Sequence, residues 1–266
     1  MNKYFYRGCS ADGTIEKKET LEDITSKNTS YFRDNLELSI SYGWCDEQGN
    51  PIPLTYRHDD YGFRNDYEYG PGKPLALGCS DTYGIGNKVE HRWSNVLESR
   101  IGEQITNLGI PGGSIKGCYR VLKAYLERFT PSKVFLLLPN AYRTEYLLHG
   151  TTEQIGPNFV LTAFTKQLFE NIFTTEENVY HEANGYLDAI KGICLEKNIK
   201  FIGIPNPTFE HYGKMLERGF EKSYDVQHLG PKFQSYIADI FFDHLQRQDF
   251  SIASYSDRFY KYDKII

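Results

Sequence analysis

A serine, an aspartate and a histidine stand at two places in the sequence where they could together form a nucleophilic site. Ser80 lies in the stretch KPLALGCSDTYGIG (residues 73–86), where a short apolar run leads through a Gly-Cys-Ser turn into a helix-periodic segment. This pattern predicts a β-strand whose carboxyl end presents Ser80 at a tight turn into a helix. A hydroxyl there could attack a carbonyl carbon, or it could simply cap the helix that follows.

His228 is the only one of the seven histidines with an aspartate three residues before it, Asp225 in the segment SYDVQHLG. This spacing would let Asp225 fold back on a loop and hold the imidazole, while the other ring nitrogen faces the serine. Acyl transfer at a serine needs such a base and such an orienting group, together with donors for the developing oxyanion. Both residues follow the last predicted strand, so they too can reach the carboxyl edge of a sheet.

The elements that must position these residues alternate regularly from residue 75 onward. Strands are expected at residues 75–77, 104–108, 134–138 and 200–204, and helices after 89, after 114, over most of 158–197 with an interruption near 174–175, and over 232–245. This order is typical of a parallel sheet with helices on both faces. We therefore expect an α/β protein, a three-layer α/β/α fold with a central parallel sheet of about five strands.

Residues 1–70 form the least regular part of the chain. The segment LELSISYGW (36–44) alternates like a strand, DEQGNP (46–51) is a turn cluster, and a second strand is expected around 54–57. We interpret residues 1–70 as an N-terminal extension with a β-hairpin that packs on a main domain, residues 71–266. Asp59, Asp60 and Arg64 in HDDYGFR could line a site, although a solvated turn explains such a charge cluster more simply.

Composition excludes several classes of function. With 266 residues, 40% of them hydrophobic and 24% charged, the chain is an ordinary globular protein that can build one large core. A net charge of −5 gives no electrostatic footprint for nucleic acid or an anionic membrane. The 21 tyrosines and 17 phenylalanines could line a groove for sugars or acyl chains. Five cysteines without a CxxC pair indicate neither a zinc knuckle nor a disulfide framework, and suit a reducing compartment.

The start of the sequence, MNKYFYRGCSADG, lacks the apolar core of a signal peptide, and the longest apolar run, 134–138, is too short to span a bilayer. We expect a protein that is cytoplasmic as synthesised, with release by lysis or association with a virion left open.

The sequence does not match the common motifs for dinucleotide, phosphate or metal binding, nor that of the α/β-hydrolase nucleophile. Residues 84–86 do not continue to the third glycine of a dinucleotide fingerprint, because position 89 is valine, and no glycine-rich loop ends in Gly-Lys-Ser/Thr. The α/β-hydrolase elbow needs glycine at position 82, where threonine stands. The other six histidines show no metal-ligand spacing. We therefore expect neither a cofactor nor a metal.

Four short motifs in this order resemble the SGNH (GDSL-type) hydrolases over residues 73–245. They are Gly-Cys-Ser-Asp-Thr at 78–82, Asn-x-x-x-x-Gly at 107–112, a loose match to Gly-x-Asn-Asp at 138–141, and Asp-x-x-His at 225–228. The resemblance implies an α/β/α fold and a serine esterase that works through an acyl-enzyme without a cofactor. The form of the first motif, with Gly-Phe-Arg upstream, is similar to members from bacteria and phages.

Carried over residue by residue, the resemblance implies that Ser80 is the nucleophile and His228 the base that later protonates the leaving group. Asp225 would fix the imidazole tautomer. The oxyanion hole would comprise the backbone N–H groups of Ser80 and Gly112 and the side-chain amide of Asn140. Gly112 suits this role because a backbone N–H approaches a substrate closely only where no side chain intrudes.

Two departures from the motifs leave alternatives open. Cys79 stands where the family usually has aspartate, so Cys79 itself is an alternative nucleophile, or a small buried residue. The third motif lacks the aspartate after Asn140, so this asparagine could be only a turn residue at a strand end.

The resemblance implies hydrolysis of small acyl esters, such as O-acetyl groups on carbohydrate. Two rival functions remain open. The same triad could pass the acyl group to a sugar hydroxyl as an O-acyltransferase, or the chain could be a catalytically silent glycan-binding or structural module. Acyl length, the alcohol part of the ester and the oligomeric state are not determined by the sequence.

Overall fold

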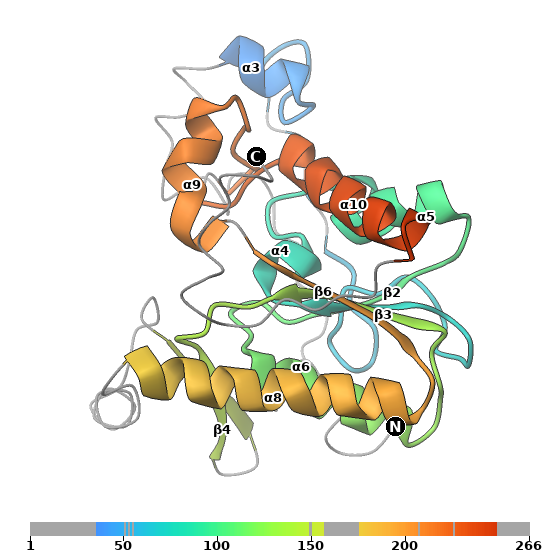
Figure 1. Cartoon of the computed structure of the whole chain (residues 1–266). Helices are drawn as coiled ribbons and strands as arrows, with labels where there is room; N and C mark the ends of the chain where they lie inside the picture. Colours follow the sequence, from blue (N-terminus) through green and yellow to red (C-terminus); the bar gives the residue numbers. More distant parts are fainter. Residues whose placement is uncertain are drawn as a thin grey trace.

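A parallel sheet of four strands lies at the centre of the molecule, in the order β2-β1-β3-β6 (Figure 1). The structure is a computed structural model and describes residues 36–50, 52, 54, 56–148, 151–156, 176–206, 208–225 and 227–248. The strands are β1 (Leu75–Gly78), β2 (Thr106–Gly109), β3 (Lys133–Leu138) and β6 (Lys200–Pro205). The predicted three-layer α/β fold with a parallel sheet is confirmed, with four parallel strands in the described part of the chain where about five were expected.

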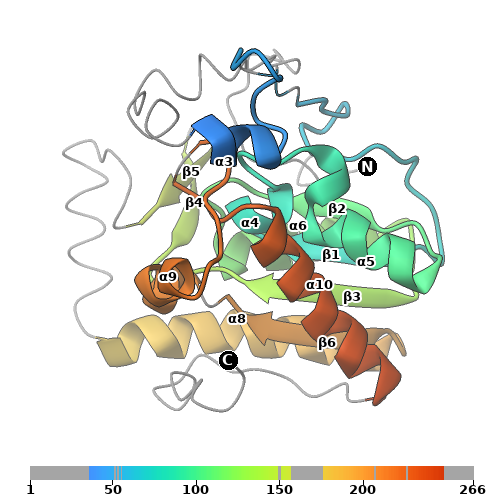
Figure 2. The same ribbon diagram turned by 90° about the horizontal axis from the view of Figure 1, so that it is seen from above.

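Helices cover both faces of this sheet (Figures 1 and 2). Helices α6 (Ile115–Leu126) and α8 (Glu176–Glu196) lie on one face, and α5 (Trp93–Ile101) and α10 (Pro231–Gln246) on the other. Successive strand residues point to opposite faces, so each strand contributes to both cores. Leu75, Leu77, Val134 and Leu136 pack toward α6 and α8, and Ala76, Phe135 and Leu137 toward α5 and α10.

The packing of α5 on α10 fixes where the chain before α10 must lie. The indole of Trp93 stacks on Phe241 with ring centroids 4.6 Å apart, and Oε1 of Gln234 accepts the backbone N–H of Trp93 at 2.8 Å. Helix α10 begins at Pro231, three residues after His228. These contacts therefore anchor the downstream end of the loop that carries His228.

The carboxyl ends of the four strands meet at one edge of the sheet. Gly78 at the end of β1 pairs with Gly109 at the end of β2, and Leu138 at the end of β3 pairs with Pro205 at the end of β6. The segments that carry Ser80, Gly112 and Asn140 begin at this edge, where ligands bind in open parallel sheets.

Of the predicted N-terminal β-hairpin, the first strand, residues 36–44, is wrong and the turn at residues 46–51 is confirmed. Residues 36–44 contain helix α3 (Leu36–Ser41), which ends where Gly43, at φ +69°, donates its N–H to the Ile40 carbonyl. A run this short satisfies a helical i, i+4 pattern as well as a strand alternation. Asp46 does form a turn, since its Oδ1 accepts the N–H groups of Gln48 and Asn50. The described residues of 54–57 form no strand.

Several elements were not predicted from the sequence. Strands β4 (Thr144–Leu148) and β5 (Thr151–Ile155) form a separate antiparallel pair, and α9 (Thr208–Glu217) follows β6. The helix expected after Ser80 is the short α4 (Ser80–Tyr83), and the helix expected after residue 89 is divided into the 3-10 turn η1 (Val89–His91) and α5. The predicted interruption near 174–175 lies outside the described residues, and α8 begins at Glu176. No helix in the described ranges has both the length and the apolar character that crossing a membrane requires.

Candidate active site

Ser80 is the first residue of α4, a single helical turn that starts directly after β1. The residue is 5% exposed, and its hydroxyl donates to Sγ of Cys79 at 3.9 Å. Its carbonyl accepts the N–H groups of Gly84 at 2.8 Å and Ile85 at 3.1 Å. The backbone N–H of a first helical residue has no acceptor within its own helix, so this donor is available at the sheet edge.

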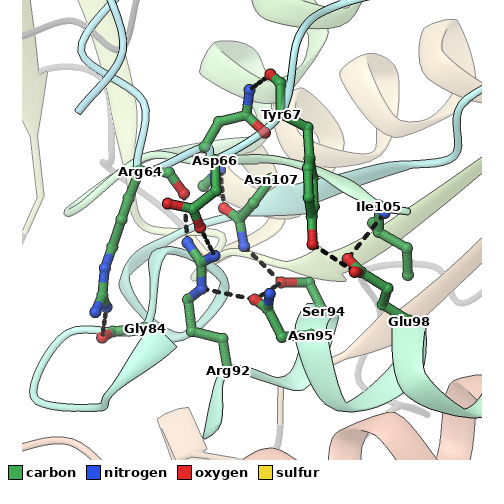
Figure 3. Close-up of polar contacts among 12 residues, drawn as sticks. Arg64, Asp66, Tyr67, Gly84, Arg92, Ser94, Asn95, Glu98, Ile105 and Asn107 are labelled. Carbon is green, nitrogen blue, oxygen red and sulfur yellow. Dashed lines mark hydrogen bonds and ion pairs between the residues drawn. The ribbon is translucent and has the colours of Figure 1, made fainter. Parts of the chain in front are cut away.

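Asn107 of the second motif ties β2 to the turn that carries Ser80. Its Nδ2 donates to Oγ of Ser94 at 2.8 Å (Figure 3). The same Nδ2 donates to the Thr82 carbonyl at 2.7 Å, while Oδ1 accepts the N–H of Gly109 at 3.0 Å. The side chain is buried, so all of these bonds form away from water. Asn107 thus holds α4 against the end of β2, a role that the motif alone did not assign.

The structure brings Asp225 and His228 together on the loop before α10. Nδ1 of the imidazole lies 2.5 Å from Oδ2 of Asp225. The other carboxylate oxygen, Oδ1, accepts the hydroxyl of Ser223 at 2.5 Å and the backbone N–H of His228 at 3.0 Å. The ring is therefore held through Nδ1, which leaves Nε2 for a reacting group.

Charges around this pair set its protonation. Burial opposes ionisation of Asp225, but the charge of His228 and the hydrogen bonds from His228 and Ser223 lower the pKa of the carboxyl to about 2. Burial also opposes a charge on His228, yet the Asp225 carboxylate, its hydrogen bond and the Asp81 carboxylate raise the pKa of the imidazole above its usual value, against the guanidinium of Arg143. A histidine base of raised pKa next to an ionised aspartate suits proton transfer.

Ser80 and His228 are not directly bonded to each other. Within the described residues no hydrogen bond joins Oγ of Ser80 to the imidazole, since the hydroxyl donates to Cys79 instead. The bond between a nucleophile and its base is often long or misaligned in an unliganded enzyme and tightens on substrate binding. The two residues are linked indirectly, through the segment that follows α4.

The two predicted oxyanion-hole residues besides Ser80, Gly112 and Asn140, lie in turns at the same sheet edge. Pro111 and Gly112 occupy the centre of a turn closed by a 2.7 Å bond from the N–H of Gly113 to the Ile110 carbonyl, with φ +69° at Gly112. Asn140 begins the turn after β3, where its Oδ1 accepts the N–H of Tyr142 at 2.8 Å. Since its acceptor is used locally, the amide Nδ2 of Asn140 is the group left for a ligand.

Cys79, the alternative nucleophile, is fully buried. Burial is the largest influence on its thiol and raises the pKa, so little thiolate exists near neutral pH. Cys79 is the residue directly before α4, the helix that presents Ser80. Its position and its burial both favour a packing role.

Three polar residues, two of which act on the charge of His228, were assigned no role from the sequence. Asp81 follows Ser80 and is buried, and its Oδ2 accepts Nδ2 of Asn206 at 2.6 Å. Asn206 stands directly after β6, a position that could have drawn attention to it. Arg143, directly before β4, acts electrostatically on both His228 and Cys79. The third motif ends two residues before Arg143, so it gave no signal there.

The HDDYGFR segment forms a turn, but the interpretation of its charges as solvated is wrong for Arg64. Asp60 is exposed, but Arg64 is 2% exposed and Asp59 accepts the N–H groups of Tyr61 and Phe63 within its own turn. The charge of Arg64 is therefore inside the protein, where it must be compensated by hydrogen bonds from its guanidinium.

As for metals, no group of three or more histidine, cysteine, aspartate or glutamate side chains that could hold an ion occurs among the described residues. Four cysteines in the described ranges, Cys45, Cys79, Cys118 and Cys194, are free and buried.

Solved structures similar to this chain include three esterases. The psychrotrophic esterase EstA from Pseudoalteromonas sp. is 16% identical, with 66% of this chain and 98% of that chain covered and a TM-score of 0.41. An acetyl xylan esterase, Est2A from the rumen bacterium Butyrivibrio proteoclasticus, is 12% identical, with 68% and 65% covered and a TM-score of 0.39. AlinE4, an SGNH-hydrolase family esterase, is 14% identical, with 72% and 90% covered and a TM-score of 0.34. No family model and no curated protein sequence matches the chain.

Proposed function

We propose that this chain is a carboxylic ester hydrolase, a serine esterase of SGNH type that removes small acyl groups. The observation that carries the proposal is the Asp225–His228 pair, with Nδ1 and Oδ2 2.5 Å apart, on a loop that contacts the segment following the Ser80 helix. A part-buried imidazole held by a carboxylate, together with a serine at a strand-to-helix turn, is the set of groups that acyl transfer requires.

In the proposed reaction, Oγ of Ser80 attacks the ester carbonyl carbon and its proton passes to Nε2 of His228. The negative charge on the former carbonyl oxygen is stabilised by the N–H groups of Ser80 and Gly112 and by the amide of Asn140. As the ester C–O bond breaks, His228 gives the proton to the leaving alcohol. Water then attacks the acyl-Ser80 by the same route, which releases the acid and restores the serine.

The proposed substrate is an acetyl ester on carbohydrate, with the alcohol part undefined. This choice follows the sequence resemblance, because O-acetyl groups on carbohydrates are frequent substrates of SGNH hydrolases. The deciding experiment measures hydrolysis of p-nitrophenyl acetate and butyrate by the full chain. It compares the wild type with Ser80→Ala and with Ser99→Ala, an exposed serine of α5 that serves as the matched control.

We expect turnover by the wild type and Ser99→Ala, a preference for acetate over butyrate, and loss of turnover in folded Ser80→Ala. Retained activity in Ser80→Ala would refute the serine mechanism. If acyl transfer to an added sugar hydroxyl outpaces hydrolysis, the protein is an O-acyltransferase with the same triad. A folded wild type that is inactive on these esters and on acetylated glycans would favour a silent glycan-binding module.

A further inference from the structure

One short segment contacts both halves of the candidate site. The bridge loop, residues 84–87, directly follows α4. Its first two N–H groups, from Gly84 and Ile85, donate to the carbonyl of Ser80 at 2.8 and 3.1 Å. Its position is thereby coupled to the backbone of the proposed nucleophile.

The same bridge loop also contacts the segment that carries the proposed acid–base pair. The Gly86 carbonyl accepts the N–H of Tyr224 at 2.9 Å, and Nδ2 of Asn87 donates to the Leu229 carbonyl at 3.2 Å. A Cβ atom on Gly86 would lie only 2.9 Å from the backbone nitrogen of Asp225, so the two backbones approach as closely as glycine allows. A shift of the bridge loop must therefore move Asp225 and His228 relative to Ser80.

Two buried side chains of the N-terminal extension, those of Arg64 and Tyr56, also bind the bridge loop. Nη1 of Arg64 donates to the Gly84 carbonyl at 2.7 Å and Nη2 to the Asn87 carbonyl at 2.9 Å. The hydroxyl of Tyr56 accepts the N–H of Gly86 at 2.7 Å. The guanidinium of Arg64 also lies over the Tyr56 ring, 4.4 Å from its centroid, so the two side chains act as one unit.

The charge of Arg64 is suited to this place although it is buried. Two of the carbonyls it binds, those of Tyr83 and Gly84, lie at the carboxyl end of α4, where a positive charge is favoured. Arg92 in turn donates from Nη1 to the Arg64 carbonyl and from Nη2 to Oδ2 of Asp66 at 3.0 Å, which fixes the Arg64 backbone (Figure 3). A guanidinium provides donors to two carbonyls at once, which an ammonium on a flexible stem does not.

We propose that Arg64, with Tyr56, is a positioning residue that sets the distance between Ser80 and the Asp225–His228 pair through the bridge loop. The inference rests on the proposed function for its kinetic consequence. On this view the N-terminal segment is part of the esterase site. Displacing a reacting group by about 1 Å can cost about 100-fold in rate.

The test uses the full chain with Arg64→Met, Arg64→Lys and Tyr56→Phe, and with Arg57→Met as the matched control. Arg57 lies in the same segment, and its side chain is exposed. Two readouts are taken: kinetics on p-nitrophenyl acetate, and the pKa of the His228 imidazole by NMR, with its signals assigned from His228→Gln. Circular dichroism and thermal melting select the folded variants. Tyr56→Phe keeps the ring and removes one hydrogen bond, so it covers the case in which Arg64→Met does not fold.

We expect Arg64→Met to lower kcat by about 10- to 100-fold with little change in KM. We expect Arg64→Lys to recover part of this loss, and Tyr56→Phe to lie between Arg64→Met and wild type. The pKa of His228 should fall toward that of an ordinary histidine in Arg64→Met and Tyr56→Phe, because Asp225 moves away, and stay unchanged in Arg57→Met.

An unchanged His228 pKa in every folded variant of Arg64 and Tyr56 would overturn the positioning role, whatever the kinetics. A second outcome separates the two proposals. If the wild type hydrolyses no ester but the pKa of His228 falls in Arg64→Met, the positioning role is supported and only the proposed function is refuted.

Discussion

The carboxylate of Asp225 binds His228 at two points, with Oδ2 2.5 Å from Nδ1 of the ring and Oδ1 3.0 Å from the backbone N–H. The two contacts fix both the ring and the peptide that carries it. His228 can therefore present only Nε2 to a serine, and its protonation should govern the rate.

The rate of ester hydrolysis should depend on the charges that face His228. His228 acts as a base only when neutral, so activity should rise with pH through its raised pKa. Asp81→Asn removes a nearby negative charge and should move this rise to lower pH. Arg143→Gln removes a positive charge and should move it to higher pH. The measurement is kcat/KM against pH, and shifts of the two variants in the same direction would contradict this placement of charge.

Asn140 should contribute through its amide donor and not through its turn. Asn140→Asp retains an oxygen that can accept the N–H of Tyr142, but it loses Nδ2. We expect kcat to fall by about 10²–10³-fold in both Asn140→Asp and Asn140→Ala, because one oxyanion donor is lost. Thermal melting should show Asn140→Asp to be the more stable variant of the two. Activity near wild type in Asn140→Asp would reduce Asn140 to a turn residue.

Cys79 should be dispensable for the chemistry. Burial raises the pKa of its thiol, so the thiolate that a cysteine nucleophile needs is scarce. Cys79→Ala should retain most of the ester hydrolysis, and iodoacetamide should leave Cys79 of the folded wild type unmodified, as judged by mass spectrometry of its peptides. Loss of turnover in a folded Cys79→Ala variant, together with activity in Ser80→Ala, would reverse the assignment.

The hairpin of β4 and β5 should depend on a buried ion pair. Nε of Arg120 on α6 lies 2.6 Å from Oε1 of Glu145 on β4, with the side chains 11% and 4% exposed. Arg120→Met should lower the free energy of unfolding by about 3–5 kcal/mol, because it leaves a buried carboxylate without this partner. The double variant with Glu145→Leu should recover much of the loss.

Urea denaturation measures these values, and the exposed pair of Arg247 and Asp243 supplies the control. Its side chains are 75% and 64% exposed. Arg247→Met should therefore change the free energy of unfolding by less than about 1 kcal/mol. Equal effects of Arg120→Met and Arg247→Met would show that burial does not strengthen the Arg120 pair.

The sequence by itself determined the features that depend on neighbours along the chain. The buried strands and their helices follow from local hydrophobic periodicity, and the contact of Asp225 with His228 spans only three residues. The turn at Gly112 follows from a glycine that tolerates a positive φ. These features needed no knowledge of distant contacts. Residues 36–44 were mispredicted because a six-residue helix and a short strand share the same apolar pattern.

Only the tertiary structure decided the environment of the charged residues around the site. Arg64 binds the Gly84 carbonyl 20 residues away, and Asn87 binds the Leu229 carbonyl 142 residues away. A charge in a polar stretch of sequence resembles a solvated turn, because its burial depends on which backbone carbonyls the fold brings to it. For the same reason no pattern in the sequence indicated the action of Asp81 and Arg143 on His228. Hydrogen-bond partners of a buried charge come from several strands and loops, and only folding assembles them.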